Sequence, residues 1–187
     1  YKTRITTGVK DNAGNTLSSQ YETSSGFTTE PLPWVGTQQL GSTSDEQAYG
    51  MTVDNLSNIY ITGFAAGGLD GNINSGISGN VGDFFLVKYN SSGTKQWTKQ
   101  MGSTSNEMGY GVTVDSSNNI YVTGYTTGGL YGNTNSGSTD IFLVKNNSSG
   151  TKQWTQQLGT STSEGGTGVT VDNSSNIYVT GYTSGGL

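Results

Sequence analysis

The sequence predicts an all-β protein assembled from repeated, four-stranded antiparallel sheets. Three observations lead to this fold class. The same order of short apolar phrases recurs along the chain, apolar and polar residues alternate within these phrases, and clusters of Gly, Ser, Thr and Asn separate them. Only 30% of the 187 residues are apolar, so thin sheets packed in series fit the composition better than one thick globular core.

The repeat is marked by a Gly-x-Thr-Val-Asp motif at 50–54, 111–115 and 168–172. The copies are 61 and then 57 residues apart, and the longer spacing comes from extra residues in one Gly/Asn-rich loop. Self-similarity at such a period is typical of repeat architectures, in which each unit buries its apolar surface against its neighbours.

Within the second copy we expect strands near 109–114, 119–125, 140–146 and 151–158, joined as an antiparallel meander. The phrase Ile-Phe-Leu-Val at 141–144 is apolar on both faces, which favours a sheet packed between two other sheets. One outer strand at about 36–41, two complete sheets and the first half of a third complete the prediction.

These phrases resemble the SBBP-type β-propeller repeats of bacteria, which are frequent in large Leptospira-like surface proteins. The resemblance covers roughly 34–187 and includes all four strand phrases in order. It implies β-propeller-type four-stranded antiparallel blades, of which about two and a half are present, whereas a closed propeller has four to eight. It also implies a secreted or cell-surface (outer membrane) location in a bacterium, and we expect the chain to be a fragment of a longer protein.

The first thirty residues differ from the repeat. Residues 1–30 resemble the last two strands of a bacterial Ig-like domain, with a turn at 11–15, so we expect a short Ig-like β-hairpin remnant there. Both prolines of the chain, Pro31 and Pro33, fall in the next segment, and 31–35 is therefore expected to be a stiff linker. The partial propeller occupies 36–187.

Composition excludes several classes of function. The chain has no Cys and no His, which removes thiol nucleophiles, Ser-His-Asp triads and the usual zinc ligands. We therefore expect no enzyme activity, no catalytic residue, no metal and no cofactor. The net charge is -5 and Arg4 is the sole arginine, so nucleic acid is not an expected partner. No stretch is apolar enough for a membrane span.

Candidate ligand-binding residues come from the face of the meander that carries the long loops, because loops can vary without disturbing a scaffold. They are carboxylates, amides and tyrosines, the groups that bind sugar hydroxyls and stack on sugar rings. The alternative is that they are ordinary turn residues. The candidates are Asp45, Glu46, Tyr49, Asp70, Asn72 and Asn74 in the first copy, and Asn106, Glu107, Tyr110, Tyr131, Asn133 and Asn135 in the second.

Other conspicuous residues have structural explanations. Asp54, Asp115 and Asp172 each end a strand before a Ser/Asn turn, and we expect their side chains to cap that turn. Trp97 and Trp154 are expected to pack within the blades. The oxygens of the Asp70 loop could serve calcium, but its spacing matches no known calcium motif, so calcium binding is left open.

The function expected from the sequence is a structural or binding module that presents its loop-rich face for adhesion or protein interaction. A carbohydrate-binding or glycan-cleaving propeller is one alternative. A purely architectural spacer or self-assembling repeat is another. The partner is an unknown protein or glycan, and self-association through open blade edges is a further expectation.

Overall fold

The computed structural model describes residues 4–5, 21–22, 37–76 and 81–186. The chain divides into two compact units, Tyr1–Val35 and Gly36–Leu187. In the first unit, β1 (Arg4–Ile5) pairs antiparallel with β2 (Tyr21–Glu22). The rest of the expected Ig-like segment and the expected linker lie outside the described residues, so both stay predictions.

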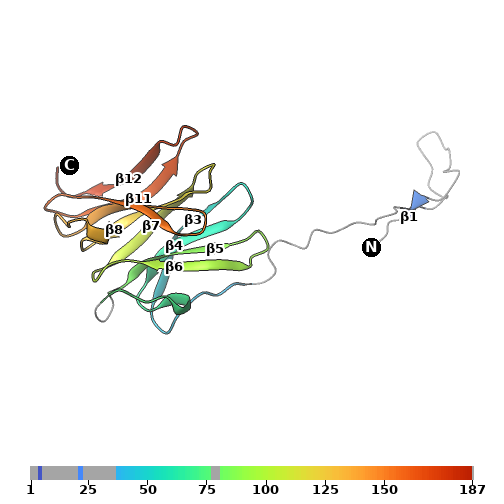
Figure 1. Ribbon diagram of the computed structural model, residues 1–187, viewed down its shortest axis with the longest axis horizontal. Helices are drawn as coiled ribbons and strands as arrows, with labels where there is room; N and C mark the ends of the chain where they lie inside the picture. The colour runs from blue at the N-terminus through green and yellow to red at the C-terminus, as the bar shows by residue number, and fades with distance from the viewer. Residues whose placement is uncertain (1–3, 6–20, 23–36, 77–80, 187) are drawn as a thin grey trace. The chain divides into compact units, whose positions relative to one another are not determined.

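The second unit begins with a four-stranded antiparallel meander, which we call blade 1 (Figure 1). Tight turns connect its first strand to its second and its third to its fourth, because an Asp or Asn side chain closes each turn on its own backbone. A long Gly/Asn-rich loop connects the two middle strands. The strands are β3 (Glu46–Val53), β4 (Ile59–Ala65), β5 (Asp83–Tyr89) and β6 (Lys95–Met101).

Blade 2 repeats this meander, and a two-stranded sheet follows it as the first half of a third blade. The all-β fold class is confirmed, and each strand predicted for the second copy is found within two residues of its predicted ends. The strands of blade 2 are β7 (Glu107–Val114), β8 (Ile120–Thr126), β9 (Asp140–Asn146) and β10 (Lys152–Leu158), and those of the third sheet are β11 (Glu164–Val171) and β12 (Ile177–Thr183).

The outer strand expected at 36–41 is wrong for the part of that range that the structure describes, because 37–41 form no strand. In blade 2 the equivalent residues belong to β10, where Gln156 pairs with Leu143 of β9. The sequence before residue 36 has no copy of the Phe-Leu-Val phrase, so 37–41 have no such strand beside them. Leu40 packs on the apolar face of blade 1 instead.

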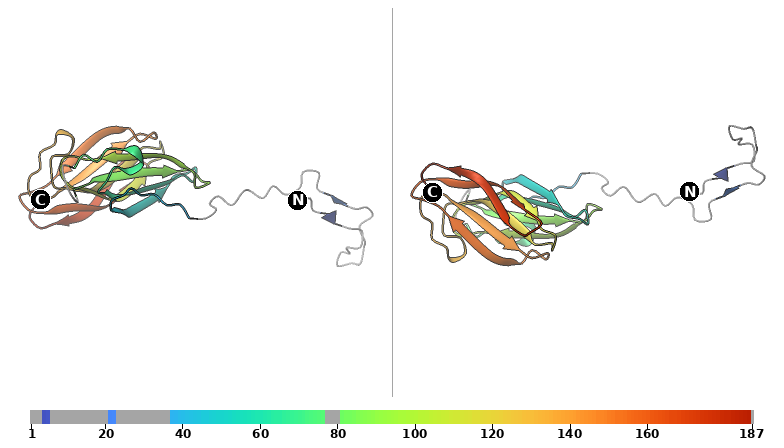
Figure 2. Two further views of the ribbon diagram at one scale, coloured as in Figure 1. Left: turned by 90° about the horizontal axis from the view of Figure 1, so that it is seen from below. Right: turned by 90° about the horizontal axis from the view of Figure 1, so that it is seen from above.

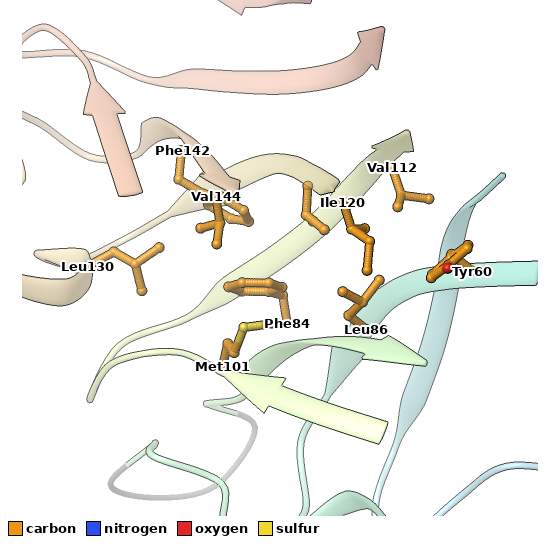
Figure 3. Packing of buried hydrophobic residues seen from close by; sticks show 10 residues of the cluster. Tyr60, Phe84, Leu86, Met101, Val112, Ile120, Leu130, Phe142 and Val144 are labelled. Carbon is orange, nitrogen blue, oxygen red and sulfur yellow. The ribbon is translucent and has the colours of Figure 1, made fainter. Parts of the chain in front are cut away.

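The sheets stack on one another, and their first strands, β3, β7 and β11, lie side by side. Figure 2 shows this stacking from two further sides. The main apolar core lies between blades 1 and 2, where Phe84 of β5 stacks on Phe142 of β9 with ring centroids 4.8 Å apart (Figure 3). Leu86 and Val144 extend this contact. Both faces of β5 are buried, whereas in β9 the residues of one face, including Ile141 and Leu143, are only partly buried, so the prediction for 141–144 holds for one face of that strand.

Each Gly/Asn loop contains one short 3-10 turn that inserts a leucine into the structure. The turns are η1 (Leu69–Gly71) and η2 (Leu130–Gly132), and Leu130 is fully buried between blades 1 and 2. Asp70 and Tyr131, which follow these leucines, have left-handed backbones with φ of 53° and 51°. The same conformation at equivalent positions shows that the two loops share one geometry despite different side chains.

No helix in the described part of the chain is long and apolar enough to cross a membrane.

Candidate functional site

The first strands of the three sheets approach one another closely because the repeated motif begins with glycine. A methyl group on Gly50 of β3 would lie 2.3 Å from the carbonyl oxygen of Tyr110 in β7. A methyl group on Gly111 of β7 would lie 2.9 Å from Cα of Gly168 in β11. Both distances are shorter than any contact a real side chain makes, so the packing of these strands requires glycine at both positions.

Each first strand has a β-bulge directly before this glycine. The register shifts between Ala48 and Gly50, between Gly109 and Gly111, and between Gly166 and Gly168. A bulge adds one residue that does not pair across the ladder, and it redirects the side chain of that residue. The bulged residues are Tyr49 in β3, Tyr110 in β7 and Thr167 in β11.

The bulges bring tyrosines from neighbouring blades together. The rings of Tyr49 and Tyr110 have centroids 4.9 Å apart and are tilted by 56°. Tyr110 in turn contacts Tyr125 of β8, with centroids 5.9 Å apart and a tilt of 45°. The ring of Tyr182 in β12 lies over Gly165, where a methyl group would be 2.6 Å from a ring carbon. We call Tyr49, Tyr110, Tyr125 and Tyr182 the tyrosine surface.

The tyrosine surface is uncharged and partly open to solvent. Tyr49 is 42% exposed and Tyr182 is 48% exposed, whereas Tyr110 and Tyr125 are half-buried. Burial, together with the nearby hydroxyls of Tyr125, Tyr49 and Tyr182, raises the pKa of Tyr110 to about 12. Its hydroxyl therefore remains protonated at physiological pH and can donate a hydrogen bond. The surface combines apolar ring faces with neutral hydroxyl donors.

Two tyrosines of this surface, Tyr49 and Tyr110, are among the residues that the sequence singles out, and the structure brings them together. The other two, Tyr125 and Tyr182, were missed. A signal for them exists in the sequence, because a Gly-aromatic pair recurs near the end of the second strand of each copy, at 63–64, 124–125 and 181–182. Alternation alone could not indicate that these rings reach the first strand of the same blade.

The glutamates among the predicted candidates hold their own loops. Glu107 is fully buried and accepts hydrogen bonds from the backbone N–H and hydroxyl of Ser103, at 2.7 and 2.6 Å, and from the hydroxyl of Thr126 at 2.7 Å. Glu46 accepts equivalent bonds from Ser42. These carboxylates shape the loops that precede β3 and β7.

The residues before these glutamates differ in exposure. The side-chain oxygen of Asn106 accepts the backbone N–H of Gly82 at 3.0 Å, a bond that links blade 2 to blade 1. Asp45 is exposed, and its backbone carbonyl accepts the N–H of Ala66.

The amides of the Gly/Asn loops bond to their own loops. Asn74 donates to the carbonyls of Ala66 and Val81, and Asn135 donates to those of Thr127 and Gly137, all at 2.7–3.0 Å. Asn72 and Asn133 donate to the carbonyls of the buried leucines of η1 and η2. These side chains stabilise the loop backbone, which is what the turn alternative expects.

Asp70 and Tyr131 occupy equivalent positions and both contact a lysine. Asp70 forms an ion pair with Lys95 and accepts the hydroxyl of Thr98. Lys152 lies over the ring of Tyr131, 4.2 Å from its centroid. The described residues contain no group of three or more His, Cys, Asp or Glu side chains placed to hold a metal.

The opposite, tight-turn end of the first strands shows the capping expected for the repeated aspartates. Asp115 accepts the backbone N–H groups of Ser117 and Asn119 at 2.9 and 2.8 Å, and the hydroxyl of Tyr121 at 3.0 Å. Burial opposes ionisation of Asp115, but these bonds outweigh it and keep its pKa below the usual range. The carboxylate therefore points into its own turn. Trp154 packs on Tyr121 with ring centroids 6.2 Å apart, as expected.

An apolar groove of about 370 Å³ lies between blade 2 and β12. At the junction of blades 1 and 2, Phe142 and Val144 of blade 2 cover the face of blade 1 that corresponds to this groove. Within the described residues, β12 pairs with β11 alone, and Leu158 at the groove is 59% exposed. The apolar side chains of the groove belong to Ile141, Leu143, Leu158, Val179 and Tyr182.

Comparison with known proteins agrees with this architecture. One curated protein, the uncharacterized WD repeat-containing protein L264 of Acanthamoeba polyphaga mimivirus, is 31% identical over 122 residues. The match covers 56% of this chain and 9% of the mimivirus protein, so the chain spans less than a tenth of that relative. The family model described as SBBP, beta-propeller repeat, matches residues 35–68, 96–132 and 153–187, which is more than half of the chain. The bulged first strands, the capped tight turns and these three matches together show that the chain belongs to the SBBP β-propeller repeat family.

Proposed function

We propose that the chain is a non-enzymatic binding module of a secreted or surface-displayed bacterial protein, and that it recognises a protein or a glycan through the tyrosine surface. The observation that carries this proposal is the gathering of four tyrosines from three neighbouring sheets. Tyrosine is well suited to recognition because it offers a large apolar area and a hydroxyl at a low entropic cost of ordering.

The other candidate residues on the long loops stabilise the loops and are less suited to contact a ligand. Glu107, Asn74 and Asn135 direct their side chains to partners within the protein. A ligand would have to break these bonds to use the same groups, and a buried acceptor left without a donor is costly. The ring faces of Tyr49 and Tyr182 are exposed and can be contacted without breaking a buried bond, although the hydroxyl of Tyr49 donates to the side-chain oxygen of Gln47 at the surface.

Glycan cleavage is less well supported than glycan binding. Hydrolysis by paired carboxylates needs two acidic side chains that reach the substrate from opposite sides. Asp83 and Glu107 do lie near each other, but both are fully buried and no substrate can contact them. We therefore propose binding without turnover, and assays of sugar release from polysaccharides with the purified chain check this choice.

A glycan array probed with the 187-residue chain tests the proposed function. We expect Tyr49→Ala and Tyr182→Ala to reduce binding at least tenfold, since stacking on one aromatic ring contributes roughly 1–3 kcal/mol. Tyr131→Ala is the matched control, because Tyr131 is 40% exposed but lies on a Gly/Asn loop. Loss of binding in Tyr131→Ala alone would move the site to the loops.

Self-association is a second candidate, favoured by the apolar groove beside β12. Within the described residues β12 pairs with β11 alone, and a strand edge without a partner is a surface on which further strands can add. We expect the chain to form larger species as its concentration rises in sedimentation velocity experiments. Leu158→Glu should suppress them, whereas Leu56→Glu, at a 70% exposed position in a tight turn, should not.

A further inference from the structure

Two buried carboxylates face each other where blade 1 meets blade 2. Asp83 is the first residue of β5, Glu107 is the first residue of β7, and both side chains are fully buried. Gly102 lies between them: a methyl group there would be 2.1 Å from Oδ1 of Asp83 and 2.6 Å from Oε2 of Glu107. The backbone N–H of Glu107 also bonds to the carbonyl of Gly82, the neighbour of Asp83, at 3.0 Å.

The hydrogen bonds of the two carboxylates are unequal. Both oxygens of Glu107 accept bonds, from the N–H and hydroxyl of Ser103 and from the hydroxyl of Thr126. Oδ2 of Asp83 accepts the N–H of Ser75 at 2.8 Å. Oδ1 of Asp83 is buried without any hydrogen-bond partner. An ionised oxygen in that position is costly, because it has lost water and gained no donor.

No positive charge offsets this pair among the contacts of the described residues. The ion pair found there joins Lys95 to Asp70 and involves neither carboxylate. Burial raises the pKa of Asp83 more than hydrogen bonds from Ser75 and Gln100 lower it. Burial, with a smaller effect of the charge of Asp83, raises the pKa of Glu107 despite the bonds from Ser103 and Thr126. Tyr131 also faces the pair from η2, and burial with the charges of Asp83 and Glu107 raises its pKa to about 12, so it stays neutral.

We propose that Asp83 carries a proton on Oδ1 in the folded chain while Glu107 is ionised, and that loss of this proton at higher pH weakens the junction of blades 1 and 2. Protonation turns the unpartnered acceptor into a donor and removes one of two adjacent negative charges. The contact between Tyr49 and Tyr110 crosses the same junction, so the proton also stabilises the tyrosine surface. This inference does not rest on the proposed binding function.

The junction between blade 2 and the sheet of β11 and β12 repeats part of this arrangement with more hydrogen-bond donors. There a methyl group on Gly159 would lie 2.0 Å from Oδ1 of Asp140, which is again unpartnered, but Oδ2 of Asp140 accepts the side-chain amide of Gln157 at 2.9 Å. Glu164, however, accepts hydroxyls from Thr160, Thr162 and Thr183, one more hydroxyl donor than Glu107 has. Hydrogen bonds from Thr160, followed by those of Thr162 and Thr183, lower the pKa of Glu164 to about 2. This carboxylate is held ionised by its donors.

The pH dependence follows from the direction of the shifts. In the folded chain the pKa of Asp83 lies above its ordinary value of 3.8. The stability due to this group is therefore fully present below pH 4 and is lost as the pH rises through the folded pKa. Thermal unfolding of the full chain between pH 4.5 and 8 measures the loss, and we expect the midpoint to fall by roughly 3–5 °C for a tenfold change in proton affinity.

Asp83→Asn is the decisive variant because an amide imitates the protonated acid, with a donor at one position and an acceptor at the other. We expect it to be at least as stable as the natural chain at pH 8 and to lose the fall in midpoint. Asp115→Asn is the matched control, since its carboxylate is held ionised and the variant should be less stable at pH 8.

A direct readout separates the proposal from other causes of pH dependence. The side-chain carboxyl carbon of Asp83, followed by NMR, should titrate well above pH 4, and the infrared band of a protonated carboxyl group should persist at pH 6 and vanish in Asp83→Asn. Titration at the ordinary value overturns the proposal. A rise in the pH 8 midpoint with calcium that is absent in Asp83→Asn also overturns it, since a cation would then fill the place of the proton.

Discussion

Alanine substitution of the three motif glycines should destabilise the protein to different degrees, although the positions are equivalent in sequence. In Gly50→Ala the new methyl group would lie 2.3 Å from the backbone carbonyl of Tyr110, and in Gly111→Ala it would lie 2.9 Å from Cα of Gly168. In Gly168→Ala the nearest atom is the rotatable hydroxyl of Thr180, at 3.0 Å. Backbone atoms cannot move aside without separating the first strands, whereas a hydroxyl can rotate.

The magnitudes follow from two opposing effects. Overpacking against a fixed backbone costs about 1–3 kcal/mol. Replacing glycine where φ is compatible stabilises by about 0.4–1 kcal/mol, since it reduces the entropy of the unfolded chain. None of the three glycines has a positive φ, so all receive this gain. We expect Gly50→Ala to be less stable than Gly168→Ala by about 1–2 kcal/mol, with Gly111→Ala between them.

Urea denaturation followed by circular dichroism measures these differences, and thermal midpoints should differ by roughly 3–8 °C between the extremes. The three variants are controls for one another, because each adds the same methyl group after the same bulge. Equal stability of Gly50→Ala and Gly168→Ala would refute the argument that close contact between the first strands requires glycine.

Three further predictions concern the core, acid stability and a surface ion pair. Phe142→Ala should cost about 3–5 kcal/mol in urea denaturation, because a fully buried ring stacked on Phe84 is lost. Phe142→Leu should cost clearly less because it keeps most of the buried apolar volume, and an equal cost would show that the ring contact with Phe84, and not the volume, supplies the stability. Asp115 has a folded pKa below its ordinary value of 3.8, so its stabilising effect is present above pH 4 and is lost as the pH falls through the folded pKa. Asp115→Asn should lose roughly 1–2 kcal/mol at pH 7 and show a shallower acid transition; an unchanged transition would contradict the capping role. Lys95→Met should change stability by less than about 1 kcal/mol, since the ion pair with Asp70 is partly exposed, and a larger loss that persists at high salt would show that the pair is more than a surface contact.

The strands of the repeat were predictable because their signals are local. Alternating residues such as Val112 and Val114, and the Asp and Asn residues that close each tight turn, define where a strand begins and ends. The segment at 37–41 was mispredicted because its sequence matches a fourth strand, but among the described residues no third strand pairs with it. A strand needs a partner for its backbone groups, and no local pattern reports whether one is present.

The candidate site was predictable in part. Tyr49 and Tyr110 stood out as aromatic residues near the long loops, and the structure places them in contact. Tyr125 and Tyr182 joined them only through the packing of second strands against first strands. The sequence singled out Glu107 as a candidate ligand-binding residue, but its carboxylate accepts hydrogen bonds from Ser103 and Thr126. These two residues lie at separate positions in the chain, so no local pattern indicates that both reach Glu107.

By itself the sequence determined the repeat, the four-stranded meander and the capped turns, because these depend on residues within a few positions of one another. The tertiary structure alone decided which side chains of different sheets meet. The bulge before Gly111 redirects Tyr110, and the stacking of blades brings Asp83 to Glu107. Such contacts depend on strand register and on the distance between sheets, which are set by packing across the whole unit and leave no mark in any short stretch of sequence.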